Sequence, residues 1–411
     1  MSLNLFVFAV INRIKMFTCH RPTLSALWQG PHHQGQDRLR LFRVAQRLWM
    51  EKDVLIKQKT KEGSQLKKYY LCRYISHNAM KRPLLIVALL AVMLSACSPQ
   101  QHHDVDFYYW KSKCEIGETE REYFGQLRSK RLFVRLFDVD VEVGKAVVVG
   151  PIQAFSKKQL PNDGTKVVPV VFITNPTFLD YVGDSAVDRL AANVNSTIAH
   201  IMKAAEVDYD EIQIDCDWTQ RTKEPYFRFL KQLAEQSGCS VSCTLRLHQI
   251  RDRQKTGVPP VSRGSLMCYA TSSPMEGDTH NSILDMELLK AYTANINEYP
   301  LDFDVVLPIY SWGIVTNHVG EVKLINGLTE ADLSTSMFEK KADHLYLIKE
   351  DGFLQGMYVN RGFTVKIEDI TPELLAEAKQ YLDQQIDRDF TWVYFHLSQG
   401  FLTRYTIENL K

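Results

Sequence analysis

The 411-residue sequence lacks the features of a polytopic membrane protein, a disordered chain or a collagen-like fibre. Its longest apolar stretch, at 83–96, has 14 residues, whereas a helix that crosses a bilayer needs ~20. The eight cysteines include no C-x-x-C or zinc-like spacing, and no glycine-rich phosphate loop follows a predicted strand. We therefore predict no metal ion and no other cofactor.

Charge is unevenly distributed along the chain. Residues 1–79 contain 14 Lys and Arg against 4 Asp and Glu, whereas residues 83–411 contain 33 against 44. The acidic surplus of the larger part speaks against nucleic acid or another polyanion as a ligand, because proteins bind such ligands mainly through Lys and Arg. We expect no nucleic-acid partner.

The boundary between the basic and acidic parts has the pattern of a secretion signal. The letters MKR at 80–82 precede the apolar stretch, and LSAC at 94–97 resembles the lipobox of bacterial lipoproteins. The resemblance implies a signal peptide at 80–96, cleavage before Cys97, and acyl chains such as palmitate on that cysteine. It also implies a membrane-anchored protein of the bacterial cell envelope, at the outer membrane or the periplasmic face. The alternative is a signal anchor that leaves residues 1–79 in the cytoplasm.

Residues 1–79 precede the expected signal peptide and need a separate explanation. Signal peptides stand at the start of a chain, so we expect that translation begins at Met80. The basic N-terminal extension at 1–79 is then an over-extended gene model or a disordered segment. Its stretch at 39–59 could instead form one amphipathic helix that binds DNA or a membrane surface.

Residues 97–411 alternate between strand and helix patterns, which is typical of α/β folds. The eight predicted strands are 105–110, 132–138, 167–174, 211–218, 240–248, 265–270, 303–311 and 391–397. The five predicted helices are 118–129, 185–206, 225–236, 283–298 and 372–386, the last with Thr371 as N-cap and Pro372 at its first position. This count predicts a (β/α)8 TIM barrel, which we expect to be a monomer. A doubly wound parallel sheet is the alternative.

One long segment departs from this alternation. Between the seventh predicted strand and the last helix, short strand-like pieces such as EVKLI, HLYLI and FTVKI follow one another. They predict a small β-rich insertion at about 313–366. Such an insertion would lie on the face of the barrel where loops build functional sites.

The fourth predicted strand places two carboxylates on one face. Side chains alternate along a strand, so Gln213, Asp215, Asp217 and Thr219 should point into the barrel and toward its C-terminal rim. Two neighbouring acids repel each other, which raises the pKa of one of them. Because inward acids have little packing value, we take Asp215 and Asp217 as candidate catalytic residues.

Two short motifs resemble glycoside hydrolase family 18, the chitinase-like barrels. DCDWT at 215–219 resembles the D-x-D-W-E signature on the fourth strand of that family, and MCYA at 267–270 resembles its M-x-Y-D motif. The resemblance implies that Asp217 orients the acetamido group of an N-acetylated sugar in a substrate-assisted reaction. It further implies that Asp215 supports Asp217 and that Tyr269 contacts the same acetamido group.

Two departures from the family pattern leave open whether the protein is an enzyme. Thr219 stands where the family has the glutamate that protonates the glycosidic oxygen, and Ala270 stands where it has an aspartate. A hydroxyl cannot donate that proton at neutral pH. The candidate proton donors are therefore Asp138 and Asp140, at the end of the second strand, or an acid on the insertion.

Aromatic and polar residues at the other strand ends are typical of a carbohydrate site, because pyranose rings stack on aromatic rings and hydroxyls need hydrogen bonds. The candidate substrate-binding residues are Trp110, Arg246, His248, Tyr269, Tyr310, Trp312 and His396. An ion pair of Arg246 with Asp217 that only stabilises the barrel is the alternative for that residue.

The function that the sequence predicts is a membrane-anchored lipoprotein whose glycosidase-like barrel acts on or binds an oligo- or polysaccharide. A non-catalytic glycan-binding protein and a structural envelope lipoprotein are the alternatives, since one fold supports many functions.

Overall fold

The computed structural model describes residues 103–142, 144–180, 183–275 and 280–411. The predictions for the extension at 1–79, the signal peptide at 80–96 and the lipid anchor on Cys97 lie outside these residues. Within the described ranges, no helix combines the length and the hydropathy that a membrane span requires.

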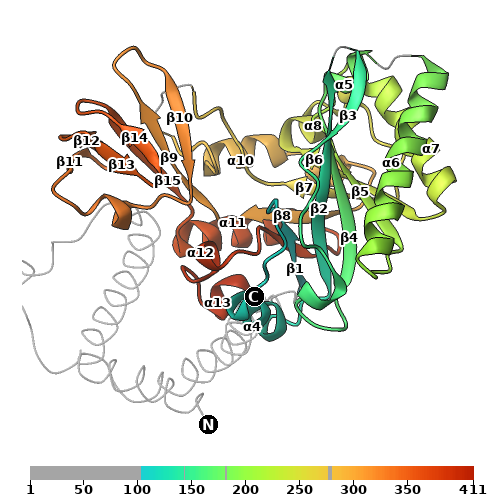
Figure 1. Cartoon of the computed structure of the whole chain (residues 1–411), viewed down its shortest axis with the longest axis horizontal. Helices are drawn as coiled ribbons and strands as arrows, with labels where there is room; N and C mark the ends of the chain where they lie inside the picture. Colours follow the sequence, from blue (N-terminus) through green and yellow to red (C-terminus); the bar gives the residue numbers. More distant parts are fainter. Residues whose placement is uncertain (1–102, 143, 181–182, 276–279) are drawn as a thin grey trace, which may run out of the picture. The chain divides into compact units, whose positions relative to one another are not determined.

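Eight parallel strands close into a barrel, which confirms the predicted (β/α)8 fold (Figure 1). In chain order they are β1 (Val105–Tyr109), β2 (Arg131–Glu142), β4 (Lys166–Ile173), β5 (Glu211–Asp215), β6 (Ser240–Arg246), β7 (Arg263–Met267), β8 (Phe303–Pro308) and β16 (Trp392–Phe395). The order in the sheet is β1-β16-β8-β7-β6-β5-β4-β2, and an additional pairing of β1 with β2 closes the ring. Each of the eight predicted strand segments overlaps one of these strands.

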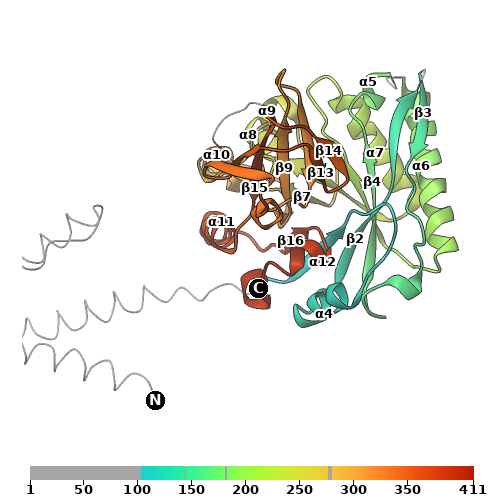
Figure 2. The same ribbon diagram turned by 60° about the vertical axis from the view of Figure 1, so that its left-hand side comes forward.

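Helices cover the outside of the barrel, as Figure 2 shows for α6 and α7 beside β4. The longer helices are α4 (Glu118–Gln126), α6 (Asp184–Ala204), α7 (Lys223–Ser237), α10 (Met286–Thr293) and α11 (Pro372–Gln385). The shorter ones are α5 (Thr177–Asp180), α8 (Leu247–Arg251), α9 (Arg253–Thr256), α12 (Gln399–Leu402) and α13 (Ile407–Leu410), with 3-10 turns η2 (Lys157–Gln159), η3 (Ile296–Glu298) and η4 (Glu330–Leu333). The start of α11 is as predicted, because the Leu374 N–H donates to the Thr371 hydroxyl (3.2 Å) and Pro372 follows this cap.

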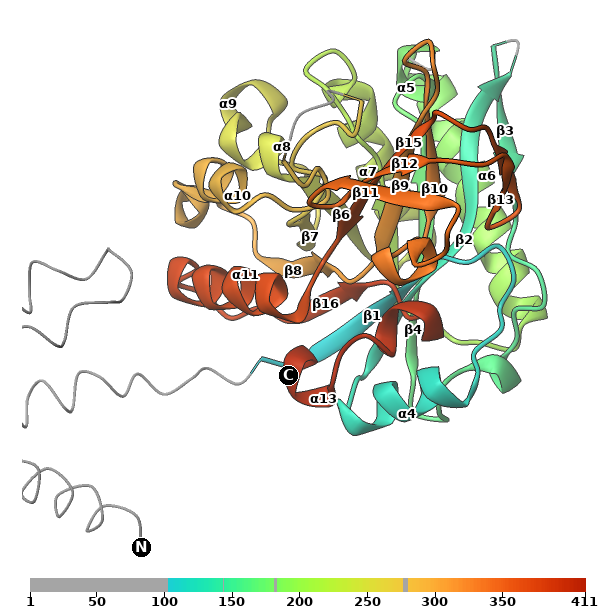
Figure 3. The same cartoon turned by 90° about the vertical axis from the view of Figure 1, so that its left-hand side faces the viewer.

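Extra strands outside the ring follow the seventh barrel strand. β9 (Ser311–Thr316), β10 (Val322–Asn326), β11 (Phe338–Ala342), β12 (Leu345–Ile348) and β15 (Thr364–Asp369) form an antiparallel sheet in the order β10-β9-β15-β12-β11, and β13 (Gly352–Leu354) pairs with β14 (Met357–Val359). This insertion sheet has its own buried core, which includes Val315, Leu328 and Val365. Gly313 permits its close packing, because a Cβ there would lie 2.3 Å from Leu328 Cδ2. Figure 3 shows its strands in front of the barrel.

Three local details differ from the sequence prediction. β2 continues beyond the ring and pairs antiparallel with β3 (Lys145–Val149), a hairpin that the sequence pattern did not indicate. The predicted strand at 240–248 is too long, so His248 lies in α8 and not on a strand face. The reason is that Gln249 Oε1 accepts the Arg246 N–H (2.8 Å), which starts a helix directly after β6. The predicted helix at 283–298 divides into α10 and η3.

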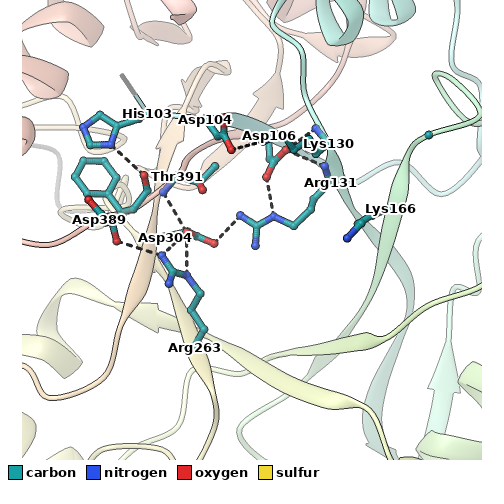
Figure 4. A pocket seen from close by; sticks show the side chains of 12 residues that line it. His103, Asp104, Asp106, Lys130, Arg131, Lys166, Arg263, Asp304, Asp389 and Thr391 are labelled. Carbon is teal, nitrogen blue, oxygen red and sulfur yellow. Dashed lines mark hydrogen bonds and ion pairs between the residues drawn. The ribbon is translucent and has the colours of Figure 1, made fainter. Parts of the chain in front are cut away.

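Buried ion pairs link β1, β2, β7 and β8 at the N-terminal mouth of the barrel (Figure 4). Arg131 donates to Asp106 (2.7 Å) and to Asp304 (2.8 Å), and Arg263 also donates to Asp304 (2.8 Å). Asp106 and Asp304 are only 3% and 2% exposed. These contacts connect strands that lie far apart in the sequence and therefore stabilise the closed ring.

The Asp304→Asn substitution is expected to lower the free energy of unfolding by about 3 kcal/mol, because it removes one side of a buried charge pair and leaves two guanidinium groups under-compensated. Chemical denaturation measures this change. The matched control is Asp302→Asn, since the Asp302 side chain is 68% exposed beside Arg388, and its effect should stay below ~0.5 kcal/mol. Equal effects of the two substitutions would contradict the stabilising role of the network.

Candidate functional site

The C-terminal ends of the strands carry the candidate site, next to a polar layer in the lumen. Tyr108 on β1 donates to Gln213 Oε1 on β5, and Gln213 Nε2 donates to Ser265 (2.9 Å) and Ser242 (3.3 Å). All four side chains are buried. The inward direction that strand alternation predicts is confirmed for Gln213, because Gln213 contacts side chains from three other strands. The predicted strand at 211–218 is too long, since β5 ends at Asp215 and Thr219 is not on its inward face.

Asp215 lies one step nearer the rim on the same inward face. It is 8% exposed and accepts a hydrogen bond from the Thr244 hydroxyl of β6 (2.6 Å). Burial raises the pKa of Asp215 to about 6, and the negative charges of Asp217 and Asp138 also raise it, whereas the Thr244 hydrogen bond and the Arg246 charge lower it. Asp215 therefore takes up or releases its proton near neutral pH.

Asp217 is the accessible carboxylate of the site. Its Oδ1 lies 2.9 Å from Arg246 Nε, and the two side chains are 48% and 28% exposed. This ion pair is compatible with both roles considered for Arg246, namely substrate binding and stabilisation of the barrel. Because the pair is open to solvent, it contributes at most about 1 kcal/mol to stability, so a polar ligand could compete for either partner.

The residues after Asp217 divide between the core and the surface. Trp218 is fully buried, donates through Nε1 to the Thr256 carbonyl (2.9 Å) and stacks on Tyr226 with ring centroids 5.2 Å apart. Thr219 is exposed, and its N–H donates to the Thr222 hydroxyl (2.9 Å) in the turn before α7. The position that carries the general acid in the resembling family is therefore a turn residue here.

Aromatic rings from four strand ends gather around Phe395 at the end of β16. The rings within 6 Å of the Phe395 centroid are those of Tyr108 (5.9 Å), Trp110 (5.6 Å), Tyr269 (5.6 Å), Tyr310 (5.9 Å) and His396 (5.4 Å). Trp312 extends the cluster from Tyr310, with centroids 5.4 Å apart. The cluster thus brings together four of the predicted substrate-binding aromatics, namely Trp110, Tyr269, Tyr310 and Trp312. Burial raises the pKa of Tyr269 and of Tyr310, so both phenols stay neutral.

Sequence reasoning selected His396 from this strand and missed its neighbour Phe395. Tyr394 is buried and donates to the Leu410 carbonyl (2.9 Å). The peptide between Phe395 and His396 is cis. The His396 Nδ1 atom is buried without a hydrogen-bond partner among the described residues, and burial lowers the pKa of His396 to about 4. His396 is therefore neutral at pH 7.

The remaining predicted residues have other partners. Arg135 binds Asp138 with two hydrogen bonds, from Nε (2.7 Å) and from Nη2 (2.5 Å). Asp140 accepts the Thr174 hydroxyl (2.7 Å), which holds the pKa of Asp140 below its usual range. Exposed His248 lies on α8, where desolvation and the Arg246 charge lower its pKa. The lowered pKa makes Asp140 a poor proton donor, and the Asp138 carboxylate is occupied by Arg135.

Glu368 is a second residue that the sequence did not reveal. It lies on β15 of the insertion sheet, is 2% exposed, and accepts hydrogen bonds from Trp312 Nε1 (2.8 Å) and from the Ser282 hydroxyl. Lys366 neutralises it at 2.8 Å. The hydrogen bond from Trp312 Nε1 to Glu368 fixes the orientation of the Trp312 side chain. Only the cross-strand register, in which Glu368 is opposite Trp312, could have indicated it.

No group of three or more His, Cys, Asp and Glu side chains with the geometry of a metal site occurs in the part of the chain that the structure describes. The described cysteines are all free thiols, four of them buried: Cys114, Cys216, Cys243 and Cys268.

Comparisons with known proteins give similarity at the level of solved structures. No protein-family model and no curated protein matches the chain. A spore cortex-lytic enzyme of Bacillus cereus is similar with a TM-score of 0.49 and 12% identity, over 76% of this chain and 73% of that chain. A chitinase of Chromobacterium violaceum has a TM-score of 0.49 at 9% identity, over 75% and 99%. A glycoside hydrolase family 18 N-acetylglucosaminidase of Paenibacillus barengoltzii has a TM-score of 0.45 at 10% identity, over 75% and 99%. The fold assignment rests on the strand order of the chain itself.

The Asp215→Asn substitution should remove a pH dependence of stability. The folded-state pKa of about 6 exceeds the ordinary value of 3.8, so the contribution of the protonated carboxyl is fully present below pH ~4 and is lost as the pH rises through ~6. We expect the free energy of unfolding of the unaltered protein to fall by on the order of 2–3 kcal/mol in this window from this one group.

Denaturation curves between pH 4 and 7 measure the effect. Asp140→Asn is the matched control, because the pKa of Asp140 is lowered and its stabilising contribution is instead lost as the pH falls. An Asp215→Asn protein with the same decrease between pH ~4 and ~6 as the unaltered chain would refute the assignment.

Proposed function

We propose that the C-terminal rim of the barrel binds a carbohydrate with N-acetylated sugar units, in a lipoprotein anchored through Cys97 in the bacterial cell envelope. The observation that carries this proposal is the aromatic cluster around Phe395, which lies at the same C-terminal end of the barrel as the exposed Asp217–Arg246 pair. Aromatic rings bind the apolar faces of pyranoses, and charged or amide-binding groups receive their polar substituents. The sequence resemblance to family 18 supports the choice of an N-acetylated ligand.

The contacts of the rim acids favour binding over hydrolysis. Glycoside hydrolysis needs a proton donor near the scissile oxygen. Asp217 is paired with Arg246, Asp138 is held by Arg135, and the lowered pKa of Asp140 keeps it ionised. Thr219 offers only a hydroxyl. None of these four groups is suited to act as the acid.

Hydrolysis is the second candidate function, and one observation favours it. Asp215 has a pKa of about 6 and is the last residue of β5, two positions before Asp217, so it can hold a proton under mildly acidic conditions. A carboxylic acid kept protonated by burial is the usual form of a glycosidase acid. In this case Asp217 would orient the acetamido group and Asp215 would supply the proton.

Binding is tested by calorimetry with oligomers of N-acetylglucosamine. We expect Trp312→Ala to weaken binding about tenfold, since an aromatic stacking contact contributes ~1 kcal/mol or more. The matched control is Tyr292→Ala: Tyr292 lies on the outer helix α10, packed against Arg251, and its loss should leave affinity unchanged. A chain that binds no glycan oligomer, or a Trp312→Ala protein with full affinity, would overturn the proposal.

Hydrolysis is tested by product analysis in the same titrations. If Asp215 is the acid, turnover should rise as the pH falls toward ~6, and Asp215→Asn should reduce it by a factor of 100 or more. Asp138→Asn serves as the control, because Asp138 is held by Arg135. Binding without products between pH 5 and 7 would leave the binding function standing and exclude the catalytic one.

A further inference from the structure

We infer that the N-terminal mouth of the barrel, on the side of β2 and β4, is a docking surface for an anionic phospholipid membrane, so that the rim with Asp217 faces away from that membrane. The inference rests on the proposed lipid anchor at Cys97. Its occupant is the headgroup layer of the membrane to which the anchor attaches the protein.

The length of chain between the anchor and the barrel limits the possible orientations. Val105 begins β1 and lies eight residues after Cys97. Because a chain spans at most about 3.5 Å per residue, the membrane attached at Cys97 lies within ~28 Å of the start of β1. That start is at the N-terminal mouth. The short connection between Cys97 and Val105 therefore leaves two possible membrane-facing surfaces, the mouth and the adjacent wall of the barrel.

Charge selects between these surfaces. Two loops beside the start of β1, at 127–131 and 157–166, contain six basic residues and one acidic residue, Asp163. The basic residues are Arg128, Lys130, Arg131, Lys157, Lys158 and Lys166, of which all but Arg131 are exposed. The loops are joined by a hydrogen bond from the Lys166 N–H to the Lys130 carbonyl (2.9 Å). We call these two loops the basic lip. Their charge contrasts with the acidic surplus of residues 83–411.

Two of the six basic residues of the lip already pair with acids. Lys130 pairs with Asp104 (2.6 Å), and Arg131 pairs with Asp106 and Asp304 in the buried network (Figure 4). By contrast, Arg128, Lys157, Lys158 and Lys166 take part in no ion pair with another described residue. Their charges are therefore available to an external anion, and each basic residue close to an anionic membrane favours contact by about fivefold.

The side of the mouth away from β2 and β4 carries acidic side chains, which determine how the barrel tilts on the membrane. The segments that enter β8 and β16, strands that pair with neither β2 nor β4, include the acids Asp302, Asp387 and Asp389. An anionic surface repels these side chains and attracts the basic lip. The barrel should therefore rest on the side of β2 and β4, with the strand direction leading away from the membrane.

The orientation is tested with the full chain purified from membranes of a bacterial host and reconstituted into vesicles of phosphatidylethanolamine and phosphatidylglycerol. A fluorescent amino acid replaces exposed Asp163 in the basic lip or, as the matched control, Val319 in the β9–β10 turn, which is 79% exposed. We expect severalfold stronger energy transfer to a rhodamine lipid from position 163 than from position 319. Equal or reversed transfer would overturn the orientation.

A charge variant tests the cause. The double substitution Arg128→Gln and Lys166→Gln should reduce the membrane-contacting population about fivefold for each charge removed in the anionic vesicles, and leave it unchanged in phosphatidylcholine vesicles. Lys323→Gln with Lys349→Gln, on the insertion, is the matched control. An unchanged energy transfer in the double variant would refute the role of the basic lip.

Mass spectrometry of the reconstituted chain distinguishes a failure of the proposed lipid anchor from a failure of the proposed orientation. An unacylated Cys97 would overturn the anchor and this orientation together, whereas an acylated Cys97 with reversed energy transfer would overturn the orientation alone. Glycan binding is measured independently, so its failure would concern the rim and not the docking surface.

Discussion

The register between β5 and β6 is the constraint on which the candidate site depends. Gln213 is the partner of Ser242 in that register, and each further pair toward the rim advances by two residues because side chains alternate. The three resulting inward pairs are all bonded: Gln213 with Ser242 (3.3 Å), Asp215 with Thr244 (2.6 Å) and Asp217 with Arg246 (2.9 Å). This ladder of three side-chain pairs changes from a neutral buried contact at Gln213 to a half-exposed ion pair at Asp217. It places one acid in the lumen and the next in solvent.

Much of this ladder follows from the sequence, because it needs only strand alternation and the neighbouring order of β5 and β6. The eight strands, the fold and the extra strands after the seventh are likewise visible in the hydrophobic pattern. Phe395 could not be found in this way, since its role depends on the aromatic rings that the closed barrel brings to it from β1, β7 and β8. Glu368 depends on the register between β9 and β15. His248 was misplaced because one hydrogen bond, from the Arg246 N–H to Gln249, ends the strand earlier than its hydrophobic pattern indicates.

The two ends of the barrel use ion pairs differently. At the mouth, Asp106 and Asp304 are almost completely buried between arginines, and separating such charges costs several kcal/mol. At the rim, the Asp217 side chain is 48% exposed, and an exposed pair contributes at most about 1 kcal/mol. A ligand can therefore replace the partner of Asp217 at little cost, whereas opening the network at the mouth would leave buried charges without partners. This difference agrees with a binding role for the rim.

The turn after β5 supports the proposed binding role of the rim over hydrolysis. The Thr219 N–H donates to the Thr222 hydroxyl, which in turn donates to Asn175 (2.6 Å) at the end of β4. Position 219 therefore serves the turn into α7, and its side chain contributes no acid. The acid with a pKa near neutrality, Asp215, is 8% exposed and bonded to Thr244. Hydrolysis would require Asp215 to deliver its proton from this buried position to a sugar oxygen, whereas binding at the exposed Asp217–Arg246 pair requires no proton transfer.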